Sequence, residues 1–88
     1  PPPDAQPSGS RIDLAASRRY FNAVNQNVDD LQRAYSRAKN YSRTAQWHVN
    51  FAERIDHLPA SGVDPALLEY GITVRERLLA LAASLRGT

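Results

Sequence analysis

The sequence predicts an all-α fold, a three-helix bundle that follows a proline-rich segment. Residues 10–58 form a run of 49 positions without glycine or proline, the residue types that most often interrupt a helix. Small and apolar side chains recur in this run at alternating spacings of three and four, which gathers them on one face of a helix. A further start signal, Val63-Asp64-Pro65, opens another helix near the C-terminus.

The first nine residues, PPPDAQPSG, hold four of the six prolines and no large apolar side chain. That composition is typical of an extended and solvated linker. We expect residues 1–9 to be disordered and residues 10–88 to form the helical bundle domain. Because the sequence opens on three prolines rather than on methionine, we also expect the chain to be a module of a larger protein.

The first predicted helix covers residues 11–38. Ser10 can cap its first N–H groups, and Asp13, three positions later, completes a variant of the capping box. The stripe on this helix consists of Leu14, Ser17, Phe21, Val24, Val28, Leu31, Tyr35 and Ala38. A stripe of this kind has to pack against another helix.

The stripe loses its register after Ala38, where two steps of three fall together. Weak helix formers follow, and Asn40 or Ser42 among them can cap a new helix. We therefore predict a kink or short break at residues 39–43 and a second helix over residues 43–58.

In the second helix the stripe continues through Tyr41, Ala45, His48, Ala52 and Ile55. Trp47 and Phe51 lie beside this stripe and widen it, so we expect both side chains in the core. The alternative to a break is one continuous helix of roughly 70 Å at 1.5 Å per residue. Such a helix would give a long hairpin whose unpaired stripe drives dimerisation.

The second helix should end at Pro59, because proline biases the preceding residue away from helical geometry. Asp64 is the expected N-cap of the third helix and Pro65 its first residue. We predict this helix over residues 65–86. Its stripe consists of Leu67, Gly71, Val74, Leu78, Leu81 and Leu85.

Gly71 lies on that stripe, where it weakens the helix but permits another backbone to approach closely. Thr73 and Glu76 form a capping box that offers a separate helix start after Gly71. The continuity of the stripe favours a single helix.

The stretch from Val63 to Val74, VDPALLEYGITV, follows an apolar-rich helix. In this it resembles segments of uncharacterised bacterial exported proteins, and the resemblance covers rather more than the second half of the chain. It implies a helical hairpin and a location outside the cytoplasm, exported or periplasmic. No activity is known for such proteins, so no functional residue is carried over.

The charged residues include ten arginines and a single lysine, with a net charge of +2. A candidate basic interaction face is formed by Arg33, Arg37, Lys39 and Arg43. Tyr35 and Tyr41 alternate with these residues, so the face has groups for phosphates and for base stacking. Asp29 and Asp30 lie one helical turn before Arg33, which is typical of intrahelical ion pairs on a solvated face.

The sequence contains no cysteine and two histidines, His48 and His57. The offsets among His48, Glu53 and His57 place them on different helix faces, unlike a helical zinc site. We expect His48 to be a stripe residue with hydrogen-bonded nitrogens, and His57 to be stabilised by Glu53 and Asp56 near a helix C-terminus. The sequence predicts no catalytic residue, metal or cofactor.

These observations favour a helical protein-interaction or structural module without catalytic activity, which binds a protein partner or a second copy of itself. The second hypothesis is nucleic-acid binding through the basic face of residues 33–43. The longest apolar stretch, residues 78–83, is too short to span a membrane, which takes roughly 20 residues.

Overall fold

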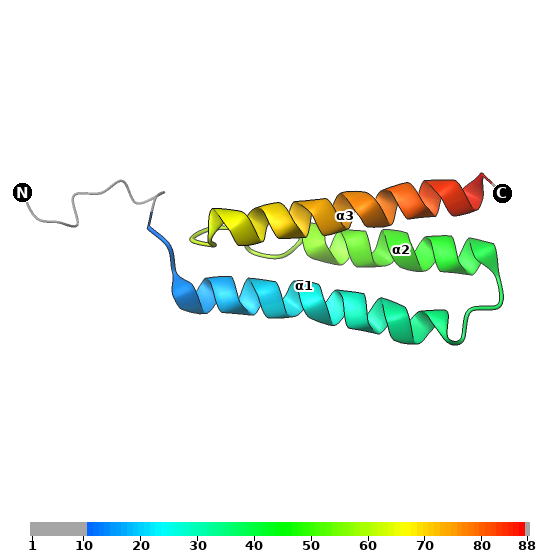
Figure 1. Ribbon diagram of the computed structural model, residues 1–88, viewed down its shortest axis with the longest axis horizontal. Helices are drawn as coiled ribbons and strands as arrows, with labels where there is room; N and C mark the ends of the chain where they lie inside the picture. Colours follow the sequence, from blue (N-terminus) through cyan, green and yellow to red (C-terminus); the bar gives the residue numbers. More distant parts are fainter. Residues whose placement is uncertain (1–10, 88) are drawn as a thin grey trace, which may run out of the picture.

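The computed structural model describes residues 11–87 and consists of three helices. They are α1 (Leu14–Tyr35), α2 (Tyr41–Asp56) and α3 (Pro65–Arg86), and no strand occurs within the described range. Consecutive helices run antiparallel, so α1 and α3 point in the same direction (Figure 1). The predicted all-α three-helix bundle is confirmed. The linker predicted at residues 1–9 lies outside the described residues.

The start of α1 differs from the prediction, because Asp13 rather than Ser10 caps the helix. The Asp13 carboxylate accepts a hydrogen bond from the Ala16 N–H at 3.0 Å. The Asp13 N–H itself donates to the Gly62 carbonyl at 2.8 Å. This long-range bond holds Asp13 in extended geometry, so the helix begins at Leu14 instead of residue 11. Ser10 lies outside the described residues.

The predicted break between the first two helices is confirmed, a few residues earlier than expected. Helix α1 ends at Tyr35, and Asn40 is the extended N-cap of α2, accepting from the Arg43 N–H at 3.0 Å. The continuous helix and the long hairpin built on it are therefore wrong. The predicted bounds 11–38 and 43–58 were each off by two or three residues, as is usual where helix ends depend on capping.

The α2–α3 connection and the third helix follow the prediction closely. Gly62 has a φ of +76°, a left-handed conformation that glycine adopts without strain. The Asp64 carboxylate caps α3 by accepting from the Ala66 N–H at 2.8 Å. Helix α3 runs unbroken through Gly71, which confirms the single-helix prediction.

The buried face of α1 is rotated relative to the predicted stripe. Its buried residues are Ser17, Tyr20, Val24, Asn27 and Leu31. Phe21, predicted on the stripe, is exposed and packs instead beside Tyr70 of α3, with ring centroids 5.6 Å apart. On α3 the prediction for Leu81 is wrong as well, since Leu81 is 45% exposed and Ala82 is buried in its place.

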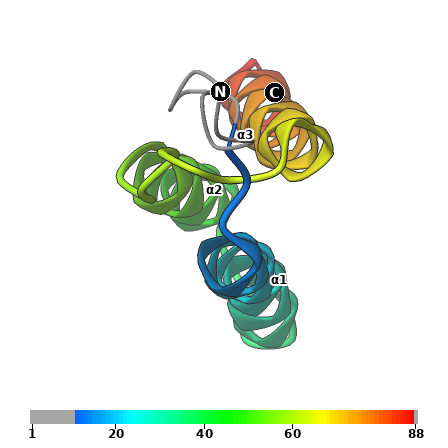
Figure 2. The same cartoon turned by 90° about the vertical axis from the view of Figure 1, so that its left-hand side faces the viewer.

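Helices α2 and α3 pack closely along their length, whereas α1 stands farther from both (Figures 1 and 2). Small buried residues explain the close pair: Ala45 and Ala52 on α2 and Ala82 on α3. Small side chains at a helix interface let the two backbones approach. Toward its C-terminal end α1 diverges from the other two helices.

Tyr20 provides the close contact between α1 and α3. A Cβ atom added at Gly71 would overlap the Tyr20 hydroxyl and lie 2.8 Å from its Cζ. The Tyr20 ring therefore packs directly against Gly71. The close approach predicted for this glycine is made by a side chain and not by a backbone. Burial raises the pKa of the Tyr20 hydroxyl.

A candidate interaction groove between α1 and α2

A groove of about 490 Å³ lies between the C-terminal half of α1 and helix α2. We call it the arginine groove. Its lining residues are Asp30, Arg33, Ala34, Arg37, Arg43, Trp47, Phe51 and Arg54. The divergence of α1 from α2 opens the space that these side chains surround.

The spacing of the lining residues on each helix explains why they meet. Asp30, Arg33 or Ala34, and Arg37 are three or four positions apart, which places them on one face of α1 and the turn that follows it. Residues 43, 47, 51 and 54 have the same spacing on α2. Because α1 and α2 run antiparallel, Arg37 and Arg43 lie at the end of the groove near the helix connection, and Asp30 and Arg54 at the other end.

Asp30 ties the two walls of the groove together. Its carboxylate accepts from Arg33 Nη2 at 2.5 Å on its own helix and from Arg54 Nη2 at 3.2 Å across the groove. Gln26 Nε2 donates to the same carboxylate at 2.9 Å. The hydrogen bonds from Gln26 and Arg54, followed by Arg33, lower the pKa of Asp30. Asp30 is therefore ionised, and its carboxylate bonds to two of the four arginines of the groove.

The floor of the groove is aromatic and apolar. Trp47 is half-buried, and Phe51 is buried with the Arg54 guanidinium over its ring at 4.8 Å from the centroid. Such a cation–π contact fixes the arginine plane on the ring. Trp47 was predicted in the core, but it lies at the edge of the core and also lines the groove.

Arg37 and Arg43 differ from the other two arginines in lacking a carboxylate. Both are exposed, and within residues 11–87 neither forms an ion pair. The first turn of α2, which contains Arg43, has no acidic residue, so the positive end of the helix dipole adds to the field there. Within residues 11–87, therefore, no carboxylate pairs with the positive charges at this end of the groove.

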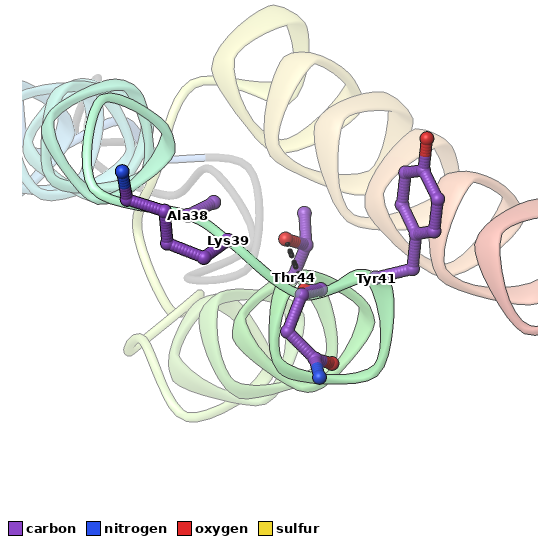
Figure 3. A pocket seen from close by; sticks show the side chains of 5 residues that line it. Ala38, Lys39, Tyr41 and Thr44 are labelled. Atoms are coloured by element: carbon purple, nitrogen blue, oxygen red, sulfur yellow. Dashed lines mark hydrogen bonds between the residues drawn. The ribbon is translucent and has the colours of Figure 1, made fainter.

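The structure brings together three of the four predicted basic residues. Arg33, Arg37 and Arg43 line the arginine groove, whereas Lys39 lines a separate hollow of about 340 Å³. The residues around that hollow are Ala38, Lys39, Asn40, Tyr41 and Thr44. Figure 3 shows Lys39 and Tyr41 pointing to opposite sides of it.

The predicted alternation of arginines with tyrosines does not form a common surface. Tyr35 turns toward the core, where its hydroxyl donates to Nε2 of His48. Tyr41 lines the hollow around Lys39. Neither tyrosine lines the arginine groove, so the aromatic groups beside the arginines are Trp47 and Phe51 instead.

The two histidines have structural surroundings. His48 is fully buried, its Nδ1–H donating to the Thr44 carbonyl at 2.8 Å and its Nε2 accepting from Tyr35, which confirms the prediction of hydrogen-bonded nitrogens. Burial raises the pKa of the Tyr35 hydroxyl. His57 caps α2 through its backbone N–H, but within residues 11–87 it forms no ion pair with a carboxylate, so that part of the prediction is wrong.

Sequence reasoning missed Asp30 and Arg54 as members of the site. The signal was available, because Arg54 follows Arg43 by eleven positions and Trp47 by seven, spacings that place all three on one helix face. What the spacing does not give is the pairing of α1 with α2, which decides that the two stripes face each other.

Three further observations bear on the site. No group of three or more histidine, aspartate or glutamate side chains in residues 11–87 is arranged to hold a metal ion. Among the helices described, none has the length and apolar character needed to cross a membrane. Comparisons with protein-family models, with curated proteins and with solved structures give no match.

Proposed function

We propose that the chain is a helical protein-interaction module without catalytic activity of its own, and that its partner binds in the arginine groove. One observation carries this proposal: two helices surround an aromatic floor with four arginines, of which Arg37 and Arg43 form no ion pair within residues 11–87. Arginine and tryptophan are the residue types enriched at the centres of protein interfaces.

The aromatic groups of the groove suit a side chain better than a nucleic-acid base. Phe51 is buried beneath Arg54, so its face is already occupied. Tyr35 and Tyr41, which would stack bases in the alternative hypothesis, lie outside the groove. Single-stranded nucleic acid binds through several free aromatic faces along a basic track, and the groove offers only the half-buried Trp47.

The overall charge points the same way. A net charge of +2 gives little long-range attraction for a polyanion. From residue 43 to residue 54 the groove spans roughly 16 Å at 1.5 Å per residue. A short protein segment can match a basic region of this length without extending its own charge beyond it.

The proposal is tested by replacing Ala34, a half-buried lining residue, with a photo-crosslinking amino acid in cells that express the chain. The expected product is a protein adduct that is lost in the Arg37→Ala/Arg43→Ala variant. Arg77→Ala removes one charge from the exposed face of α3, and the adduct should persist in this control.

Three results would contradict the proposal. The first is a nuclease-sensitive adduct at Ala34, which would assign the groove to nucleic acid. The second is a protein adduct that the two arginine substitutions do not affect. The third is an adduct formed only from a crosslinker placed on the Arg77 face, which would locate the interaction elsewhere. An adduct of twice the chain mass would identify the partner as a second copy.

A further inference from the structure

The groove already contains one carboxylate, and this shows how another would bind. Arg33 and Arg54, from opposite walls, both donate to the Asp30 carboxylate. Arg37 follows Arg33 by one helical turn, and Arg43 is the corresponding arginine on the α2 side. Like the first pair, this second pair has one arginine from each wall of the groove. Unlike the first pair, it binds no carboxylate within residues 11–87.

The aromatic floor lies between the two pairs. Along α2 the order is Arg43, Trp47, Phe51 and Arg54, and Ala34 lies opposite the middle of this series. A ligand that places a carboxylate between Arg37 and Arg43 therefore has its neighbouring groups beside Trp47. Because Trp47 is half-buried and Ala34 has no polar side-chain atom, that position favours an apolar group.

We propose that the arginine groove binds an acidic peptide segment that carries an apolar side chain next to its carboxylates. The carboxylates pair with Arg37 and Arg43, and the apolar side chain covers Trp47. This inference rests on the proposed function and adds the chemistry of the partner. Asp30 is a positioning residue that holds Arg33 and Arg54 and neutralises the far end of the groove.

Bidentate arginine–carboxylate pairing gives such a site both strength and orientation. Arg54 is already oriented by Phe51 and Asp30, so that end of the groove needs no ordering when a partner binds. The binding energy should come mainly from the Arg37 and Arg43 end and from Trp47.

Trp47 is the only tryptophan of the chain, so its fluorescence reports directly on the groove. The experiment titrates the full chain with a synthetic peptide of about ten residues, long enough to span roughly 15 Å as a helix, made of glutamates with two leucines at its centre. A second peptide replaces the leucines with serine, and oligothymidylate of equal charge serves as the nucleic-acid probe.

The expected result is a saturable change in Trp47 emission with the glutamate–leucine peptide, weakened by salt. Arg37→Ala and Arg43→Ala should each reduce affinity about tenfold or more, as expected for a charge-assisted hydrogen bond, whereas Arg77→Ala should leave it unchanged. The serine peptide should bind more weakly. Asp30→Asn removes the negative charge that neutralises Arg33 and Arg54, so it should tighten binding of the acidic peptide. Partial unfolding cannot produce such a gain.

The inference is overturned if the peptide does not bind, if Arg37→Ala and Arg43→Ala behave like Arg77→Ala, or if leucine and serine peptides bind equally. Failure with the peptides, together with a protein adduct at Ala34, would reject the acidic partner and leave the proposed function standing. Tighter binding of oligothymidylate through the same arginines would reject both.

Discussion

The α2–α3 pair and the α1–α2 pair are both antiparallel neighbours, yet they pack differently. Small residues such as Ala45, Ala52 and Ala82 let α2 and α3 approach closely. The buried face of α1 instead contains Ser17, the bulky Tyr20 and Asn27, and α1 diverges from the pair (Figure 1).

The difference shows how one small bundle can combine a stable core with an open groove. Helix α1 is held by specific polar contacts rather than by extensive apolar packing. Ser17 Oγ accepts from the Asp64 N–H at 2.9 Å, and the Tyr70 hydroxyl donates to Asn25 at 3.1 Å. Directional bonds position a helix while burying less apolar surface. The groove is found along the looser of the two helix pairs.

The largest effects should come from a matched pair of core truncations. Leu78 on α3 and Leu31 on α1 are the same residue type and each is 6% exposed. Leu78→Ala should lower the free energy of unfolding by about 2–5 kcal/mol, and Leu31→Ala by less, because its looser surroundings lose fewer contacts. Urea unfolding followed by circular dichroism measures both, and an equal or larger loss for Leu31→Ala would contradict the difference in packing.

Gly71→Ala should come next, with a net loss of about 1–3 kcal/mol from overpacking. The added Cβ collides with Tyr20, and this outweighs the gain of about 1 kcal/mol in helix propensity. In a Tyr20→Phe background, which removes the nearest atom, the same substitution should cost less. Equal costs in the two backgrounds, measured by urea unfolding, would show that Tyr20 is not seated on Gly71.

Tyr35→Phe tests the polar contact that holds the C-terminal end of α1. It leaves Nε2 of the buried His48 without its donor, which should cost about 1–2 kcal/mol. Hydrogen exchange should rise around residues 31–48. The matched control is Tyr41→Phe, since Tyr41 is 71% exposed and makes no side-chain hydrogen bond within residues 11–87; a similar effect there would contradict the role of Tyr35.

Tyr20, which is buried, and Tyr35, which is partly exposed but bonds through its hydroxyl to the buried His48, predict a fall in stability at alkaline pH. Burial raises the pKa of Tyr20 and of Tyr35 above the ordinary value of about 10. The unfolded chain therefore loses these protons first, so stability is fully present below about pH 10 and declines as the pH rises through the folded-state values. Urea midpoints between about pH 8 and 11 should show the fall, and the Tyr20→Phe/Tyr35→Phe variant should flatten it.

The smallest effect is expected for an ion pair within the close helix pair. Arg75 Nη1 on α3 lies 2.8 Å from Asp56 Oδ1 on α2, and surface pairs of this kind contribute little. Asp56→Asn should change the free energy of unfolding less than any substitution above, and salt should reduce the difference further. A loss as large as that of Leu78→Ala would mean that charge rather than packing holds α2 against α3.

Local signals in the sequence accounted for most of the helices. The register shift after Ala38 and the cap formed by Asp64 and Pro65 gave the helix count and the bounds of α3. The start of α1 was missed because it depends on the bond from Asp13 to Gly62, which joins residues far apart in sequence.

The choice of buried residues was less predictable. Phe21 and Tyr20 lie on adjacent sides of α1, and the space over Gly71 decides that Tyr20 is the buried one. Three of the predicted basic residues of the groove, Arg33, Arg37 and Arg43, could be found from their spacing. Their grouping with Arg54 could not, because it depends on how α1 and α2 pair.

Native-state hydrogen exchange of the full chain, followed amide by amide at low denaturant, tests most directly whether α1 is the loosely held helix. The account predicts that amides of α1 exchange through a partial opening of lower free energy than those in the middle of α2 and α3. Equal protection in all three helices would mean that the bundle opens only as a whole, and would contradict the division between a tightly packed pair and a helix that borders the groove.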